Sequence, residues 1–215
     1  MKKALILIIA GVCLVQINGL SQKTQVGLTG GITFSNINGQ IDGQDIHNDG
    51  RAGMTVGMIV DAPIGKSGFN FQPGLHYTQK GAFTNKSANV KEAIALRYAE
   101  LMLNFIHYTK GTSTRLFFGL GPAVAFNLPS KKVVISENNR QETTITFGKE
   151  ATDSYRGVDF GANGLLGIRF KCGLIAAVNY TYGIRNLIPI PSGDDVVRNG
   201  CAGIRIGYFF RNATK

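Results

Sequence analysis

Six charged side chains stand out because they fall on the polar face of otherwise apolar, alternating segments. They are Glu100, Arg115, Asp159, Arg169, Arg185 and Arg205. A charge that leaves water must be paired or hydrated. If these segments are strands of a closed barrel, the six side chains crowd its lumen and form either a narrow, gated ion path or a polar plug that fixes the register. An eight-stranded barrel has little room beyond its own side chains, so we favour the plug.

The spacing of these charges predicts two ion pairs. A tight turn centred on Cys172 would place Asp159 directly opposite Arg185 on the neighbouring strand. Glu100 and Arg205 both fall near mid-height of strands that face each other across an eight-stranded lumen. We therefore expect a second pair there.

Histidines are the candidates for general acid–base chemistry. His76 falls on the inward face, His107 outward near a strand end, and His47 in a loop. The sequence has no G-x-S-x-G or H-E-x-x-H motif. We predict no catalytic residue and a protein that is not an enzyme. The alternative, an envelope enzyme acting on lipid or protein, would need His76 or His107 beside a serine or carboxylate at an exposed rim.

Other candidate sites have weaker support. The carboxylates of the segment 42–50 suit calcium, but their spacing misses the EF-hand pattern and lacks its closing glutamate. The glycines of 27–31 resemble a phosphate loop, yet no helix follows them. Cys172 and Cys201 are expected too far apart for a disulfide. We predict neither a metal nor a cofactor.

The elements that position these residues are strands. Apolar and polar residues alternate with a period of two in eight segments, and strands of roughly ten residues suit a tilted membrane crossing. The segments cover residues 25–34, 53–60, 69–78, 98–105, 115–126, 158–170, 174–185 and 202–210.

The connections between these segments alternate in length. The short ones are 61–68, 109–114 and 171–173, and the long ones are 35–51, 82–93, 128–154 and 186–198. An up-and-down outer-membrane barrel has short periplasmic turns and long extracellular loops. We therefore predict an all-β fold, an eight-stranded antiparallel up-and-down transmembrane barrel with its long loops outside the cell and its short turns in the periplasm.

Alternation alone does not separate a membrane barrel from a soluble, lipocalin-like binder, which points its apolar face inward. Here the polar face is rich in small residues, which suits a tight lumen. The apolar face carries large residues that are often aromatic near the strand ends, for example Phe34, Phe126 and Phe170. The mean hydropathy of +0.04 is compatible with both folds. The distribution of side chains favours apolar residues facing lipid.

The first residues read as an export signal. Lys2 and Lys3 precede an apolar run, 4–15, that is too short to span a bilayer as a helix. We predict a signal peptide over 1–21 and a barrel domain over 22–215. The net charge of +10 is scattered rather than gathered into one arm, which argues against nucleic acid. The expected partners are outer-membrane lipid and lipopolysaccharide, together with other envelope proteins.

Several segments resemble the Bacteroidetes outer-membrane β-barrel family often called PorT-like. The similar segments are FQPGLHYTQKGA (71–82), YAELML (98–103), FGLGP (118–122), DFG (159–161) and YTYGIRNL (180–187). The sequence departs from the family at Met102, Gly74 and His76, where Pro, Glu and Leu are usual. The resemblance implies an outer-membrane barrel of a Gram-negative bacterium. The founding member is an accessory of type IX protein secretion, a role that fold alone does not transfer.

The leading hypothesis is a non-enzymatic outer-membrane barrel that acts through its external loops or as an accessory of an envelope or protein-secretion machine. A narrow, porin-like channel for small solutes is the first alternative, and an outer-membrane enzyme is the second. Steady current across a planar bilayer would favour the channel.

Overall fold

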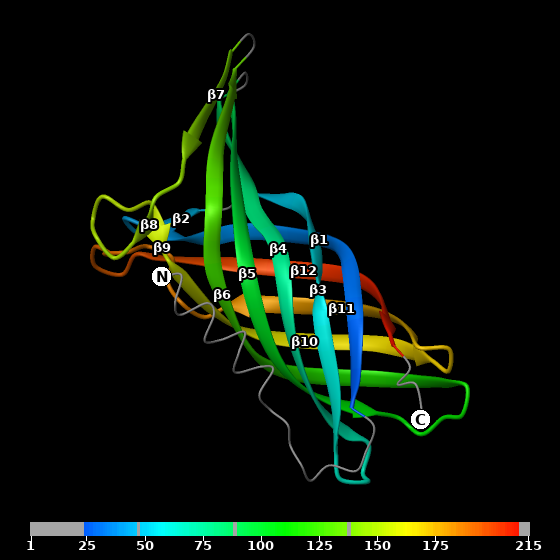
Figure 1. Ribbon diagram of the computed structural model, residues 1–215. Helices are drawn as coiled ribbons and strands as arrows, with labels where there is room; N and C mark the ends of the chain where they lie inside the picture. The colour runs from blue at the N-terminus through cyan, green and yellow to red at the C-terminus, as the bar shows by residue number, and fades with distance from the viewer. Residues whose placement is uncertain (1–23, 47, 88–89, 137–138, 211–215) are drawn as a thin grey trace.

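Strands joined by turns make up the part of the chain that the computed structural model describes, residues 24–46, 48–87, 90–136 and 139–210 (Figure 1). Within these residues, no helix is long and apolar enough to cross a membrane. The predicted signal peptide, 1–21, lies outside the described residues. The strands are β1 Gln25–Ile41, β2 Gln44–Ile46, β3 Asp49–Ile64, β4 Phe69–Ser87, β5 Val90–Tyr108, β6 Thr114–Ser136, β7 Asn139–Thr144, β8 Phe147–Gly148, β9 Tyr155–Arg156, β10 Val158–Phe170, β11 Leu174–Gly183 and β12 Val196–Phe209.

Eight of these strands close into a ring. β1, β3, β4, β5, β6, β10, β11 and β12 each pair antiparallel with the next, and β12 returns to β1 over the register Gly27↔Phe209 to Gln40↔Val196. Closure gives the backbone N–H and C=O groups of the wall a partner on a neighbouring strand, which a lipid environment requires. The predicted all-β, eight-stranded up-and-down barrel is confirmed.

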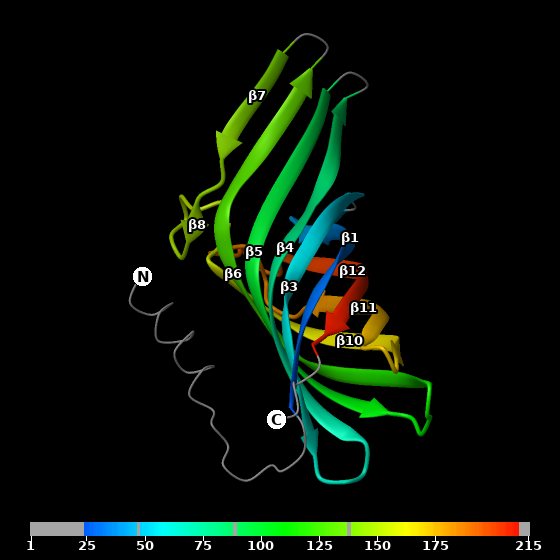
Figure 2. The same cartoon turned by 45° about the vertical axis from the view of Figure 1, so that its right-hand side comes forward.

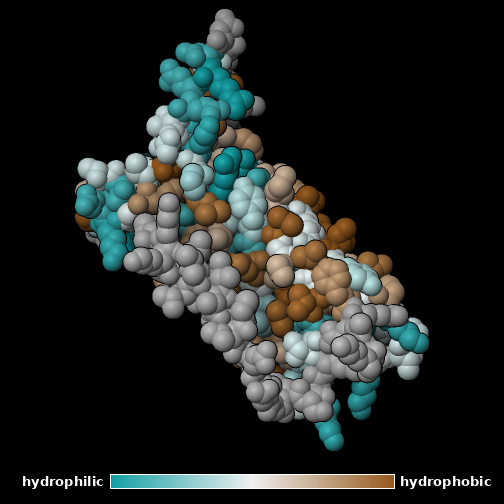
Figure 3. Space-filling model, viewed as in Figure 1, coloured by the Kyte–Doolittle hydropathy of each residue, from teal (hydrophilic) through white to brown (hydrophobic). Residues whose placement is uncertain are grey.

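Side chains alternate across the barrel wall as the sequence pattern requires. On β3, Met54, Val56 and Met58 are each 54% exposed on the outside, whereas Thr55 between them is 2% exposed and faces the lumen. Large exposed apolar side chains recur on all eight strands. On the face seen in Figure 3, apolar residues form a band below a hydrophilic tip. A soluble protein rarely exposes so continuous an apolar surface. Apolar side chains therefore face lipid.

The strands differ greatly in length, and the difference shapes the molecule. β11 has ten residues, which matches one tilted crossing of a bilayer. β6 has 23 residues, and at about 3.3 Å per residue it extends roughly 75 Å. β4, β5 and β6 therefore continue beyond the ring, and β7 pairs with the far part of β6. Figure 2 shows this four-stranded extension rising above the barrel; we call it the projecting sheet.

Three predicted loops are largely strands instead. In 35–51, β1 runs on to Ile41, β2 covers Gln44–Ile46 and β3 begins at Asp49. The sequence predicts a loop over 82–93, but Phe83 pairs with Ala93 and Ser87 with Val90, in a ladder whose register shifts between Asn85 and Ser87. Within 128–154, β6 runs on to Ser136 and turns back as β7. Charged residues are compatible with strand conformation in these segments. Outside the membrane their side chains can lie in water while the backbone hydrogen bonds of the ladder continue.

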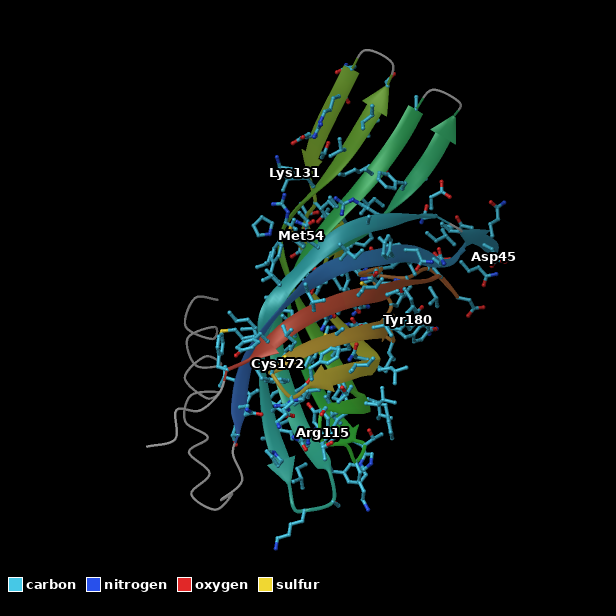
Figure 4. The ribbon with its side chains drawn as sticks, turned by 90° about the vertical axis from the view of Figure 1, so that its right-hand side faces the viewer. Asp45, Met54, Arg115, Lys131, Cys172 and Tyr180 are labelled. Atoms are coloured by element: carbon cyan, nitrogen blue, oxygen red, sulfur yellow. The ribbon has the colours of Figure 1, made fainter. Side chains whose placement is uncertain are left out.

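The short connections lie within the ranges that the sequence predicts, although β3 runs on to Ile64 and shortens the first of them to 65–68. β3 and β4 are joined by a turn in which Gly65 and Gly68 have φ of 65° and 82°, and Gly173 between β10 and β11 has φ of 101°. These values lie in the left-handed region, which glycine adopts without steric cost. Figure 4 places Arg115 and Cys172 near the short-turn end and Asp45 and Lys131 at the opposite end.

Candidate functional site

A buried cluster around Asp61 occupies the short-turn end of the lumen. Arg169 Nη1 lies 2.6 Å from Asp61 Oδ2, and its guanidinium also bonds to the side-chain oxygen of Gln25. Asn70 Nδ2 donates to Asp61 Oδ1 at 2.9 Å, and the Tyr108 hydroxyl donates to Asp61 Oδ2 at 3.2 Å. The cluster joins β1, β3, β4, β5 and β10, so it ties together strands from around the ring.

A second buried ion pair lies farther up the lumen. Lys80 Nζ is 2.7 Å from Glu100 Oε1, and the two side chains are 3% and 1% exposed. The Lys80 ammonium also lies 5.4 Å from the centroid of the buried Tyr98 ring, a cation–π contact. Both charges are therefore held by neighbours rather than by solvent.

Between the two ion pairs, the lumen holds neutral polar side chains together with Arg205, whose Nη1 lies 3.5 Å from His76 Nε2. Asn163 Nδ2 donates to Asn104 Oδ1 at 2.9 Å, and Asn163 Oδ1 accepts from Asn179 Nδ2 at 3.1 Å. His76 Nε2 lies 3.1 Å from the Thr29 hydroxyl. These bonds link strands across the lumen.

The six charged residues singled out in the sequence do not form one network. Asp159, Glu100 and Arg169 are buried in the lumen, and Arg205 is partly buried there. Arg115 lies near the short turns, with its guanidinium 4.9 Å from the Tyr108 ring centroid.

Neither predicted ion pair forms among the described residues. Arg185 Nη1 donates to the backbone oxygen of Val158 at 3.1 Å and leaves Asp159 Oδ1 without a hydrogen bond. β11 ends at Gly183, so the ladder stops before the position that would align Arg185 with Asp159. Glu100 binds Lys80 instead of Arg205, because Lys80 lies on the adjacent strand.

Sequence reasoning missed the two residues that complete the ion pairs, Asp61 and Lys80. Asp61 directly follows the alternating segment 53–60 and was counted into the turn. Lys80 lies two positions beyond the segment 69–78 and has the same parity as His76 and Thr78. Extending each alternation by two residues would have placed both side chains in the lumen.

An apolar cluster lies toward each end of the lumen, which is less polar there than the alternation predicts. The cluster at the short-turn end consists of Ile59, Ile106, Tyr108, Phe117, Ile175 and Phe209. The cluster at the long-loop end consists of Ile37, Ala82, Ile94, Leu96, Tyr98, Ala125, Ile145, Leu187 and Val197. Between them, beside His76 and Arg205, lies a void of about 30 Å³, which has room for about one water molecule.

The other candidate residues do not come together into a site in the described part of the chain. His76 is buried at mid-lumen beside Thr29 and Arg205, and the His107 ring packs on the outer wall between Phe69 and Phe118. His47 lies outside the described residues. No group of three metal-ligating side chains occurs in the described part of the chain. Cys172 is exposed, Cys201 is buried, and both are free thiols.

The outer strands of the projecting sheet, β6 and β7, form an exposed cluster of charges, whereas Glu92 on β5 is buried and pairs with Lys132 at 2.8 Å. Lys131 Nζ lies 2.7 Å from Glu142 Oε2, and Arg140 Nη2 lies 2.8 Å from Glu142 Oε1. These hydrogen bonds hold the pKa of Glu142 below its usual range. All six residues of β7 are exposed, and among the described strands β7 pairs only with β6. One edge of the projecting sheet is therefore open.

Comparison with known proteins gives a family and a set of similar barrels. Residues 20–189 match the family model of an outer membrane protein beta-barrel domain. Among solved structures, the chain is similar to OprG from Pseudomonas aeruginosa (12% identity, 88% of this chain and 97% of that chain, TM-score 0.49). It is also similar to Ail of Yersinia pestis (13%, 88% and 100%, TM-score 0.43) and to the outer membrane enzyme PagL (12%, 86% and 99%, TM-score 0.44). No curated protein matches the chain significantly in sequence.

Proposed function

Because the chain belongs to the family of outer membrane protein beta-barrel domains, we propose that it is a non-enzymatic, non-conducting barrel that works through its projecting sheet. In this proposal the long connections face the outside of the cell and the short turns face the periplasm. The observation that supports the proposal is a lumen occupied by ion-paired and hydrogen-bonded side chains, with an apolar cluster toward each end. A barrel that does not conduct has to act through its surfaces.

The open edge of β7 supports docking of an extended segment from another envelope protein. An edge strand offers unpaired N–H and C=O groups to which a further strand can add. The edge strand Asn139–Thr144 is fully exposed and free of proline. Arg140 and Glu142 discourage unselective pairing with apolar strands, so the edge favours a polar, charge-matched segment. A secretion accessory of the PorT-like kind is one form that such docking can take.

Conductance tests the closed lumen. We expect the purified barrel to give no steady current in planar bilayers under conditions where a general porin conducts. Discrete, steady channels from the wild-type protein would contradict the proposal and favour the solute pore.

Cross-linking in cells tests the docking role. A photoreactive amino acid at Gln141, exposed on β7, should yield discrete protein adducts in the native envelope. The same amino acid at Lys66, exposed at the opposite end of the barrel, is the matched control. Adducts from Lys66 alone, or from neither position, would contradict docking through the projecting sheet.

A further inference from the structure

A groove of about 490 Å³ opens on the lipid-facing side of the wall where β1, β12 and β11 lie side by side. Its volume lies within the range of small-molecule sites. Unlike the apolar wall below it, the groove presents side chains that bind polar groups. They are Asn36, Asn38, Tyr180, Tyr182 and Arg198.

The length of β11 gives the depth of this groove in the membrane. Leu174–Gly183 has ten residues, enough for one crossing, so its two ends lie at the two membrane interfaces. Leu174 follows the short turn, and Tyr182 is the penultimate residue at the other end. The Tyr182 hydroxyl accepts a hydrogen bond from Arg198 Nη1 at 3.1 Å. Arg198 therefore lies at headgroup level on the long-loop side.

The groove exists because its floor is a glycine. Gly200 pairs with Asn36 on one side and with Tyr182 on the other. A Cβ at Gly200 would lie 2.8 Å from Asn36 Oδ1 and 2.9 Å from the Tyr180 hydroxyl. Any side chain at this position would collide with Asn36 and Tyr180 and displace them from the groove.

The charge in the groove favours an anion. Arg198 is exposed and forms no ion pair with any described residue. The carboxylate that lines the groove, Asp45, lies at its loop end, beside Gln40. Figure 4 shows Asp45 at the strand tip and Tyr180 farther down the wall. Arg198 lies at the level of Asn38, between Asp45 and the deeper end, which is left to neutral hydroxyl and amide groups.

We propose that this groove binds the phosphorylated sugar headgroup of an outer-leaflet glycolipid. Arg198 binds the phosphate, since a guanidinium forms strong, charge-assisted hydrogen bonds to phosphate oxygens. The tyrosine hydroxyls and the two asparagines bind sugar hydroxyls, and Asp45 accepts from the sugar on the loop side. The acyl chains then lie along the apolar wall. The proposal rests on the orientation proposed above, with the long connections outside the cell.

Binding is tested on the purified full-length barrel in mild detergent. The probes are bisphosphorylated lipid A, its dephosphorylated form and phosphatidylglycerol, and native mass spectrometry measures the bound fraction. We expect the wild type to prefer the phosphorylated glycolipid, and Arg198→Gln to lose about tenfold in affinity, the usual scale of one charge-assisted bond. Gly200→Leu should abolish binding by displacing Asn36 and Tyr180. Lys66→Gln, which removes a cation at the opposite interface, should leave binding unchanged.

Two outcomes would overturn the proposal: equal affinity for the phosphorylated and dephosphorylated lipids, or equal losses in Arg198→Gln and Lys66→Gln. Preference for phosphatidylglycerol would also overturn it, because it would indicate a general anionic-lipid contact. Heat-dependent gel mobility shows whether each variant is folded. Since the measurement uses neither bilayer current nor cross-linking at Gln141, its failure is distinguishable from failure of the proposed docking function.

Discussion

Two ion-pair clusters of similar geometry lie in opposite surroundings. Arg169 and Asp61 meet at 2.6 Å with side chains 8% and 3% exposed, inside the lumen. Lys131 and Glu142 meet at 2.7 Å with side chains 53% and 36% exposed, on the projecting sheet. The N–O distances of the two pairs are nearly equal, but their exposure to solvent differs. A buried charge that loses its partner has no water to replace it, whereas an exposed charge does.

The largest effect is expected from Arg169→Met. The substitution leaves Asp61 buried without its cation and removes the bond to Gln25 and the stacking on Phe209, whose ring centroid lies 4.4 Å from the guanidinium. Breaking a buried pair in this way costs about 3–5 kcal/mol. The measurement is urea unfolding in lipid vesicles followed by circular dichroism, because the chain has no tryptophan to report by fluorescence.

The double variant Asp61→Asn with Arg169→Met is the control for this prediction. It removes both charges, and replacing a buried pair by neutral groups is often close to neutral for stability. We expect it to regain most of the stability that Arg169→Met loses. If the double variant is as unstable as the single one, packing rather than the uncompensated charge of Asp61 explains the loss.

A smaller loss is expected from Lys80→Met. Lys80 holds Glu100 by one bond and contacts Tyr98, whereas Arg169 has more partners, so we expect a loss of about 3 kcal/mol, the low end of the range for a broken buried pair. The same unfolding measurement checks it. Bilayer current should stay at zero, because an apolar cluster still lies toward each end of the lumen. Current in Lys80→Met alone would identify the Lys80–Glu100 pair as a gate.

Much of the barrel could be predicted from sequence, because the alternation within each strand shows which side chains face the lumen and which face lipid. Because side chains alternate between the two faces of a strand, one residue known to be buried tells which face each remaining residue of that strand is on. His76 and Glu100 were placed in the lumen on that basis, and the structure has both there. The order of short and long connections then indicated an up-and-down barrel, and the pairing of β12 with β1 closes the ring.

Pairing between side chains on different strands could not be predicted in the same way. It depends on where a ladder ends and on which strand is adjacent, and neither is visible in one segment. Arg185 lies beyond the last pair of β11 and turns to a backbone oxygen, so it does not reach Asp159. Glu100 has Lys80 on the next strand, nearer than Arg205.

The projecting sheet escaped prediction for a different reason. Polar and charged residues such as Glu142 and Arg140 are typical of loops, and a water-exposed strand has no apolar face to give it a period. All six residues of β7 are exposed. Its strand conformation comes from pairing with β6 rather than from its own pattern.

The smallest effect is expected from Glu142→Gln on the projecting sheet. Hydrogen bonds from Lys131 and Arg140 hold the pKa of Glu142 below its usual range. Because the pKa of Glu142 is lower in the folded state than in the unfolded state, the ionised side chain stabilises the fold above the unfolded pKa. This stabilisation is lost as the pH falls through the folded pKa, so the loss occurs below about pH 4.3, the ordinary pKa of glutamate. Solvent screens both partners, and we expect the melting temperatures of Glu142→Gln and the wild type to agree at pH 7 and at pH 5. A loss comparable to that of Arg169→Met would show that burial does not separate the two clusters.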